Sequence, residues 1–98
     1  MSKMFFPSQY KKAILKKTKI VTIRVDSEID KYKINKTYMA CSYGGTGWKR
    51  KIKITKTKKS SVGDLLKLGF PQKSLTSLKV SNHLKKSDIV QIIHFEYL

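Results

Sequence analysis

The sequence predicts an α+β fold, a small β-barrel of mixed or antiparallel strands with short flanking helices. Residues 48–57 alternate apolar and lysine side chains with a period of two, which is typical of a strand with one face in solvent. Residues 89–97 are apolar at successive positions, which is typical of a strand covered on both faces. Short segments with helical spacing lie before and between these two strands, so helices are expected at the edge of the barrel.

The 98 residues suffice for one domain with a single modest core, so residues 1–98 are expected to fold as one unit. The last strand is expected to be central. Residues 42–47 are interpreted as a hairpin connection, and Asn35 suits a left-handed turn position. Six further elements are expected: helices at 9–17, 60–69 and 74–84, and strands at 19–25, 32–35 and 37–41.

The strand at residues 19–25 separates its side chains by face. Its branched apolar residues are expected in the core, so Thr22 and Arg24 lie on the opposite face, with Lys19 just ahead of them. An ammonium, a hydroxyl and a guanidinium close together can hold a phosphate or polarise an amide. The simpler alternative is a strand with one solvated polar face. The predicted core residues are Val21, Ile23, Val25, Ile52, Ile54, Ile92 and Ile93.

The chain is strongly basic, with a net charge of +16 from 22 Lys and Arg residues against six acids. Such a charge attracts polyanions such as RNA, DNA or an anionic membrane surface. Arg24 and Arg50 are the only arginines. Because lysine acts as a point charge, this balance favours contacts to phosphates over the reading of bases. A general enrichment in lysine is the alternative explanation.

Three of the six acids gather at residues 26–30. This loop either neutralises nearby lysines or supplies a carboxylate to the polar face of the preceding strand. Cys41 is the only cysteine, so no internal disulfide is expected, and the two histidines complete no metal-binding pattern. Neither a metal nor another cofactor is therefore expected. No long apolar run suggests a membrane span, and the cytoplasm, or a host cytoplasm for a viral gene, is the expected location.

Residues 17–24 resemble the signature of the ASCH domain family, whose fold is a PUA-like β-barrel. That signature is Gly-x-Lys-x-x-Glu-x-Arg. Lys19 and Arg24 match it, whereas Lys17 replaces the glycine and Thr22 replaces the glutamate. The threonine is similar to the small branch of bacterial acetylcytidine amidohydrolases, which also ends in a segment like residues 92–98. The resemblance covers most of the chain and implies a domain that binds RNA or a nucleotide.

In the amidohydrolase branch, a lysine and a threonine on this strand act with a glutamate from after the middle of the chain. Lys19 and Thr22 take the first two places. The glutamate is expected near Pro71 or Gln72, where this chain has no acid. If the chain is such an enzyme, Thr22 attacks the N-acyl carbonyl, Lys19 takes its proton, and Arg24 or a backbone amide holds the oxyanion.

Binding of RNA, another single-stranded nucleic acid or a modified nucleoside is the favoured hypothesis, by a monomer or a weak dimer. The amidohydrolase is the second hypothesis. The third is a DNA-binding protein that acts through charge alone, and its binding would depend only on the number of lysines. Trp48 and Tyr43 are candidate stacking platforms, although a place in the core is the alternative for Trp48. The expected nucleic-acid contacts are Lys17, Lys19, Arg24, Trp48, Lys49, Arg50, Lys51 and Lys53.

Overall fold

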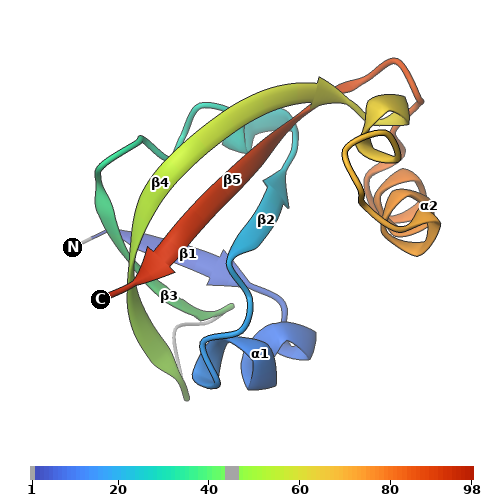
Figure 1. Ribbon diagram of the computed structural model, residues 1–98. Helices are drawn as coiled ribbons and strands as arrows, with labels where there is room; N and C mark the ends of the chain where they lie inside the picture. Colours follow the sequence, from blue (N-terminus) through green and yellow to red (C-terminus); the bar gives the residue numbers. More distant parts are fainter. Residues whose placement is uncertain (1, 44–46) are drawn as a thin grey trace.

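The structure is a computed structural model that describes residues 2–43 and 47–98. A single sheet curves around one side of the molecule, and short helices lie at its edges (Figure 1). Single 3-10 turns occupy Ser8–Tyr10 (η1), Asp26–Glu28 (η2) and Gly63–Leu65 (η3). The strands and helices are β1 (Lys3–Phe6), α1 (Lys11–Leu15), β2 (Val21–Arg24), β3 (Thr37–Ser42), β4 (Lys49–Ser61), α2 (Gln72–Asn82) and β5 (Ile89–Tyr97).

The sheet has the strand order β1-β3-β4-β5-β2. β1 pairs with β3 in parallel, and the other neighbours are antiparallel. The predicted α+β class and the mixed sheet are therefore confirmed, and β5 lies inside the sheet as expected. β1 and β2 are its two edges and share no backbone ladder in the described part of the chain, so closure into a barrel is not confirmed.

One side chain connects these two edges of the sheet. Arg24 of β2 donates from Nη2 to the carbonyl of Phe5 in β1, at 2.8 Å. Its guanidinium also lies over the ring of Phe6, 4.8 Å from the ring centroid. Arg24 thus joins β1 to β2 at the place where a closed barrel would have a backbone ladder.

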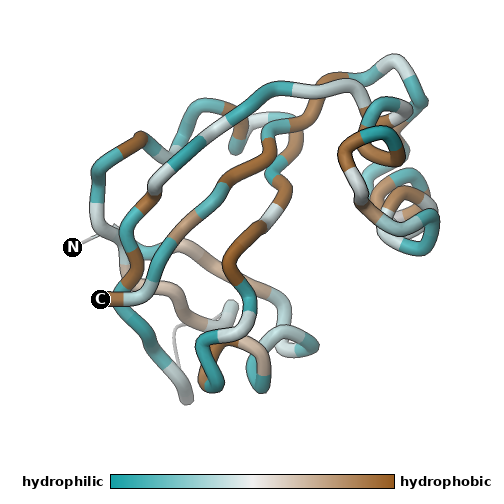
Figure 2. The backbone as a smooth tube through the Cα atoms, in the orientation of Figure 1, coloured by the Kyte–Doolittle hydropathy of each residue, from teal (hydrophilic) through white to brown (hydrophobic). Residues whose placement is uncertain are grey.

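The core has two apolar clusters, one on each face of β5. Ile93 and Phe95 point into the first cluster, inside the curve of the sheet. Val90 and Ile92 point into the second, where η3 and α2 cover the sheet. Figure 2 shows the result along the chain, with apolar residues frequent in β5 and rare in β4. The predicted core residues Ile52, Ile54, Ile92 and Ile93 are all buried.

The burial expected for β2 was wrong, although its alternation was right. Thr22 and Arg24 are the buried residues, with 6% and 7% of their surface exposed. Val21, Ile23 and Val25 are only half-buried, against the second cluster. The reason is that β2 is an edge strand whose polar side chains turn into the curve of the sheet. Hydrogen bonds there satisfy them, as buried polar groups require.

Several local predictions also change. Residues 32–35 form turns and not a strand, although Asn35 has the expected left-handed backbone, with φ of 67°. The parallel strand β1 was not predicted, because four residues are too few to show a period. The predicted helix at 60–69 is reduced to η3 and turns that end at Gly69, whose φ is 95°. β3 and β4 form the predicted hairpin, and residues 44–46 of its connection lie outside the described residues.

Candidate functional site

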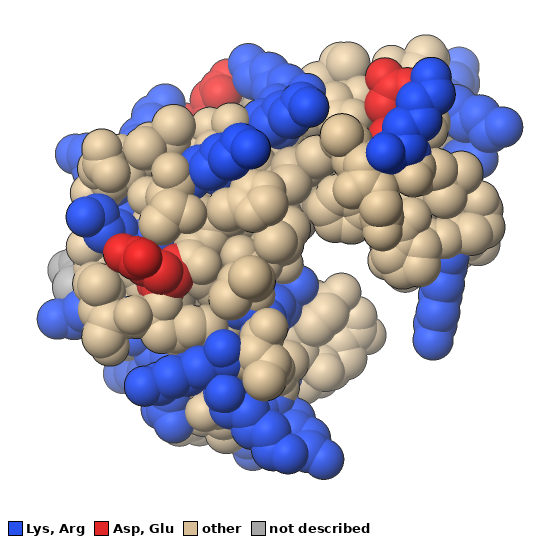
Figure 3. Space-filling model, viewed as in Figure 1, with Lys and Arg blue, Asp and Glu red and all other residues tan. Residues whose placement is uncertain are grey.

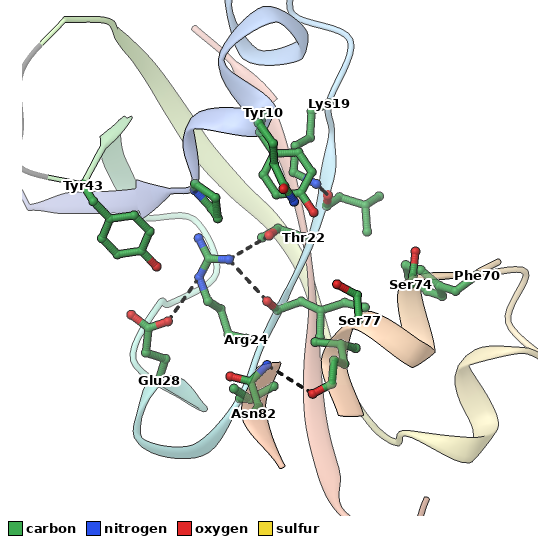
Figure 4. Close-up of a pocket in the computed structure, with 16 residues that line it drawn as sticks. Tyr10, Lys19, Thr22, Arg24, Glu28, Tyr43, Phe70, Ser74, Ser77 and Asn82 are labelled. Carbon is green, nitrogen blue, oxygen red and sulfur yellow. Dashed lines mark hydrogen bonds and ion pairs between the residues drawn. The ribbon is translucent and has the colours of Figure 1, made fainter. Parts of the chain in front are cut away.

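A cleft of about 530 Å³ lies between β2 and α2. The space-filling view shows the hollow that separates α2 from the rest of the molecule (Figure 3). The chain from Val21 to Val25 forms one wall of the cleft, and α2 presents Ser74 and Ser77 from the other (Figure 4). A volume of this size suits a small organic ligand or one nucleotide.

Lys19 brings one cation to the cleft. Its Nζ donates to the carbonyl of Val21 at 2.7 Å and lies 4.2 Å from the ring centroid of Tyr10. The pKa of Lys19 is lowered from 10.5 to about 8, first by burial and second by the positive charge of Arg24. Lys19 is therefore charged at neutral pH and can lose its proton a little above it.

Arg24 brings the second cation and is held by several partners. Its Nη1 donates to Thr22 Oγ1 at 2.8 Å. Its Nε lies 3.5 Å from a carboxylate oxygen of Glu28, close enough for an ion pair but without hydrogen-bond geometry. Glu28 belongs to the acidic loop at residues 26–30. This loop therefore supplies a carboxylate to the polar face of β2, which was one of the two roles that the sequence suggested for it.

The structure thus brings Lys19, Thr22 and Arg24 to one cleft, which is one of the two interpretations that the strand pattern left open. Among the described residues, Glu28 is the only acid that lines it, and that carboxylate is paired with Arg24. Near the position where the resemblance places a glutamate, α2 carries the hydroxyls of Ser74 and Ser77 instead. No group of three His, Cys, Asp or Glu side chains that could hold a metal occurs within 2–43 and 47–98.

Aromatic side chains add to the walls of the cleft. Tyr10, Tyr43 and Phe70 line it, and they come from three separate segments of the chain. Tyr43 is 66% exposed and stacks on Phe5, with ring centroids 5.8 Å apart. Sequence reasoning noticed Tyr43 but missed Tyr10, Phe70 and the two serines of α2. No local pattern marks these residues, because only the tertiary fold brings α2 opposite β2.

Three of the predicted nucleic-acid contacts belong neither to the cleft nor to the predicted lysine row on β4. Trp48 is 6% exposed and belongs to the first apolar cluster, so it is a core residue and not a stacking platform. Arg50 is half-buried and donates to the carbonyl of Lys49 at 2.8 Å, with no acid as partner in the described residues. Lys17 is exposed in the turn after α1, with φ of 60°, and does not line the cleft.

The predicted lysine row on β4 is longer than the sequence indicated. Lys53 pairs with Glu96 of β5, and Lys56 pairs with His94, whereas Thr55 between them has no partner. This extra residue is a β-bulge, which shifts the alternation by one. Because Glu96 and His94 share a face of β5, the lysines before and after the bulge share a face of β4. We call this row, Lys49, Lys51, Lys53, Lys56 and Lys58, the lysine stripe.

Four of the five stripe residues are exposed, and Lys53 is half-buried. Figure 3 shows Lys and Arg side chains over β4 on this side of the molecule, with only a few separate acids. Lys59 is not part of the stripe, because it faces the other way and forms an ion pair of 2.8 Å with Asp30. The stripe is therefore a line of free positive charge along the longest strand.

Comparison with known proteins supports the fold. No family model matches the chain, and no curated protein matches its sequence. Its structure matches the crystal structure of an ASCH domain from Lactobacillus crispatus, with a TM-score of 0.64 and 14% sequence identity, over 98% of this chain and 78% of that one. The class of protein is thus a domain with the ASCH fold. This confirms the fold that the signature of residues 17–24 implied.

Proposed function

We propose that the chain is a binding module for single-stranded RNA, which holds one nucleotide in the cleft and the adjoining backbone on the lysine stripe. The observation that carries this proposal is the cleft itself, where two cations lie on one wall and three aromatic side chains frame the space. Aromatic faces stack with bases, and cations bind phosphates. A second cavity, beside α1, is lined by lysines but by no aromatic side chain.

The size of the cleft favours an unpaired nucleotide over a duplex. A volume of about 530 Å³ admits a single base with its sugar, and a base can enter only when it is not stacked in a helix. RNA loops and ends expose such bases. The protein therefore suits single-stranded segments.

The lysine stripe supports the same ligand. Neighbouring lysines on one face of a strand are roughly 6.6 Å apart, since the rise per residue is about 3.3 Å. This repeat is close to the separation of successive phosphates in an extended strand of RNA. Lysines in such a row neutralise phosphates without reading bases, so binding is expected to depend on salt more than on sequence.

The test is fluorescence anisotropy with a labelled single-stranded RNA of about 12 nucleotides, at several salt concentrations. We expect binding at ~50 mM salt that weakens as salt rises, with a slope of roughly −0.7 per contacted phosphate. Tyr10→Ala should weaken binding, because Tyr10 frames the cleft, whereas Phe5→Ala should affect it only through the stacked Tyr43. Absence of binding at ~50 mM salt would overturn the proposal.

One observation favours an amidohydrolase as a second candidate. The pKa of Lys19 is lowered to about 8, so this lysine can serve as a general base toward Thr22 in the same cleft. Neutral Lys19 would take the hydroxyl proton as Thr22 Oγ1 attacks an N-acyl carbonyl. Two contacts oppose this role in the present arrangement: Lys19 Nζ is bound to the carbonyl of Val21, and Thr22 Oγ1 accepts a hydrogen bond from Arg24.

Release of acetate from an acetylated cytidine nucleoside decides between the two candidates. An enzyme would lose this activity in Thr22→Ala and keep part of it in Thr22→Ser. Lys19→Arg would be nearly as damaging, because a guanidinium is no base at neutral pH. A binding module releases no acetate and tolerates Lys19→Arg. Robust hydrolysis that Thr22→Ala abolishes would replace the binding proposal for the cleft.

A further inference from the structure

The wall of the cleft that β2 forms is the open edge of the sheet. Within the described residues β2 pairs only with β5, and its other side faces the cleft, so residues 21–25 line that space. An open edge presents N–H and C=O groups that have no ladder partner. Whether each of these groups is free or already hydrogen-bonded therefore decides which ligand the edge can bind.

The register shows which residues turn their backbone toward the cleft. Phe95 of β5 donates its N–H to the carbonyl of Ile20 at 3.0 Å. In an antiparallel pair, backbone groups point alternately toward and away from the partner strand. Ile20, Thr22 and Arg24 therefore face β5, and Val21 and Ile23 face the cleft.

The two carbonyls that face the cleft are already occupied. The carbonyl of Val21 accepts from Lys19 Nζ at 2.7 Å, and the carbonyl of Ile23 accepts from Arg24 Nη1 at 3.3 Å. The N–H groups of Val21 and Ile23 have no partner among the residues that the structure describes. The edge thus offers donors only, with a cation beside each occupied carbonyl.

An edge of this kind does not suit an added peptide strand, because such a strand needs acceptors as well as donors. It suits an anion, which takes hydrogen bonds from N–H groups and gains from nearby positive charge. Glu28 is the opposing charge, and its carboxylate is paired with Arg24. Two cations against one carboxylate leave the edge positive.

The distance between the two N–H donors limits the choice of anionic ligand further. Residues two apart on a strand are roughly 6.6 Å apart, and the oxygens of one phosphate are too close together to meet both N–H groups. Two phosphates that follow each other along one strand have the required separation. We infer that the open edge of β2 binds two successive phosphates of one RNA strand, one at the N–H of Val21 and one at the N–H of Ile23. This inference rests on the proposed function.

The test uses amide signals of the ¹⁵N-labelled full chain in NMR titrations with three probes: uridine, uridine monophosphate, and a uridine dinucleotide that carries a 5′-phosphate. We expect the dinucleotide to shift the amide signals of both Val21 and Ile23, and the monophosphate to shift one of them at most. Uridine should shift neither. Signals of Ile20 and Thr22, whose N–H groups face β5, are the internal control.

A backbone variant gives a second measurement. Ile23→Pro removes the N–H that faces the cleft without breaking a bond to β5, and Ile23→Ala keeps that N–H but shortens the same side chain. We expect Ile23→Pro to bind the dinucleotide about tenfold more weakly than Ile23→Ala. If Ile23→Pro does not fold, the parent titration decides alone.

The outcomes separate this inference from the proposed function. If RNA and the dinucleotide bind while the signals of Val21 and Ile23 stay in place, the edge subsite is wrong and the RNA-binding module stands. If no probe and no RNA binds, both are wrong. Equal shifts of both signals from the monophosphate and the dinucleotide would also overturn the pair of phosphates, since a single phosphate would then be enough.

Discussion

The cleft and the lysine stripe use positive charge in opposite ways. The cleft has two cations that hydrogen bonds hold in place, of which Arg24 is buried and Lys19 is half-buried. The stripe has five lysines, most of them exposed, and none forms an ion pair in the described part of the chain. The cleft therefore fixes the position of a charge, whereas the stripe supplies a number of charges. The first arrangement suits orientation of a ligand, and the second suits attraction.

The two regions should also respond differently to salt and to mutation. Exposed charges are screened beyond about 8 Å at physiological ionic strength, and buried ones much less. Loss of a buried, hydrogen-bonded cation leaves its partners unsatisfied, whereas an exposed lysine leaves none. These contrasts can be measured on single chains.

The largest expected effect is on stability, in Arg24→Ala. This change removes the link between β1 and β2 and leaves Glu28 without its partner. We expect a loss of about 2–3 kcal/mol in the free energy of unfolding, less than for a fully buried pair because the Glu28 side chain is 35% exposed. Urea denaturation measures it. Lys53→Ala is the control and should stay within about 0.5 kcal/mol. Equal losses in the two variants would remove the distinction between fixed and free cations.

The next effect is on RNA affinity, when Lys51, Lys53, Lys56 and Lys58 are changed together to Gln. We expect single-stranded RNA to bind at least about 30-fold more weakly at ~100 mM salt, with a salt slope reduced by up to ~2.8. The dinucleotide, which is expected to contact the cleft and the edge of β2 and not the stripe, should bind nearly as before. The matched control changes four exposed lysines elsewhere to Gln, Lys11, Lys12, Lys16 and Lys73. If this control weakens RNA binding equally, overall charge is decisive and the third hypothesis, charge alone, is correct.

These two regions also show how much of the structure could be predicted from the sequence. The row at residues 49–53 was visible because a strand with one solvated face repeats every two residues. Its continuation to Lys56 and Lys58 was not, because the bulge at Thr55 changes the phase and depends on pairing with β5. On β2, the pattern showed which residues share a face. It did not show which face is buried, since that depends on the contact of Arg24 with β1, a strand that is distant in sequence.

The cleft itself could be predicted only in part. Lys19, Thr22 and Arg24 are close in sequence, so a strand places them together. Phe70, Ser74 and Ser77 reach them through the packing of η3 and α2 on the second cluster. Such packing leaves no local signal in a single sequence. The missing glutamate near Pro71 was a correct observation, and serines of α2 line that side of the cleft.

The smallest expected effect is on pH dependence. Because the pKa of Lys19 is about 8, its protonated fraction falls from about nine-tenths at pH 7 to about one-tenth at pH 9. We expect the dinucleotide to bind about fivefold more weakly at pH 9 than at pH 7. Lys19→Gln should bind weakly at both pH values, with a flat profile. Titration by calorimetry measures this, and an unchanged profile in Lys19→Gln would exclude Lys19 as the source.

The same pKa has a consequence for stability with a definite sign. The folded chain holds the proton of Lys19 less tightly than the unfolded chain, whose lysine has the ordinary value of 10.5. The unfolded state therefore binds more protons between pH 8 and 10.5, and the contribution of Lys19 to stability rises with pH in that window. Binding to RNA should show the opposite trend. Opposite slopes for one residue would mark Lys19 as part of the cleft and distinguish it from the stripe.

The bulge at Thr55 also affects how this strand can change in evolution. A substitution at one stripe position removes one charge, but loss of a single codon at Thr55 would remove only the extra residue and leave residues 56–61 paired with β5 as they are now. Lys56 and Lys58 would then stay on the face of the lysine stripe, and Ser60 and Val62 would keep their buried places. Length variation is usually tolerated in loops and selected against in strands. The bulge is an exception within this strand, because relatives of this chain can lack the residue at Thr55 and still keep the lysines on one face.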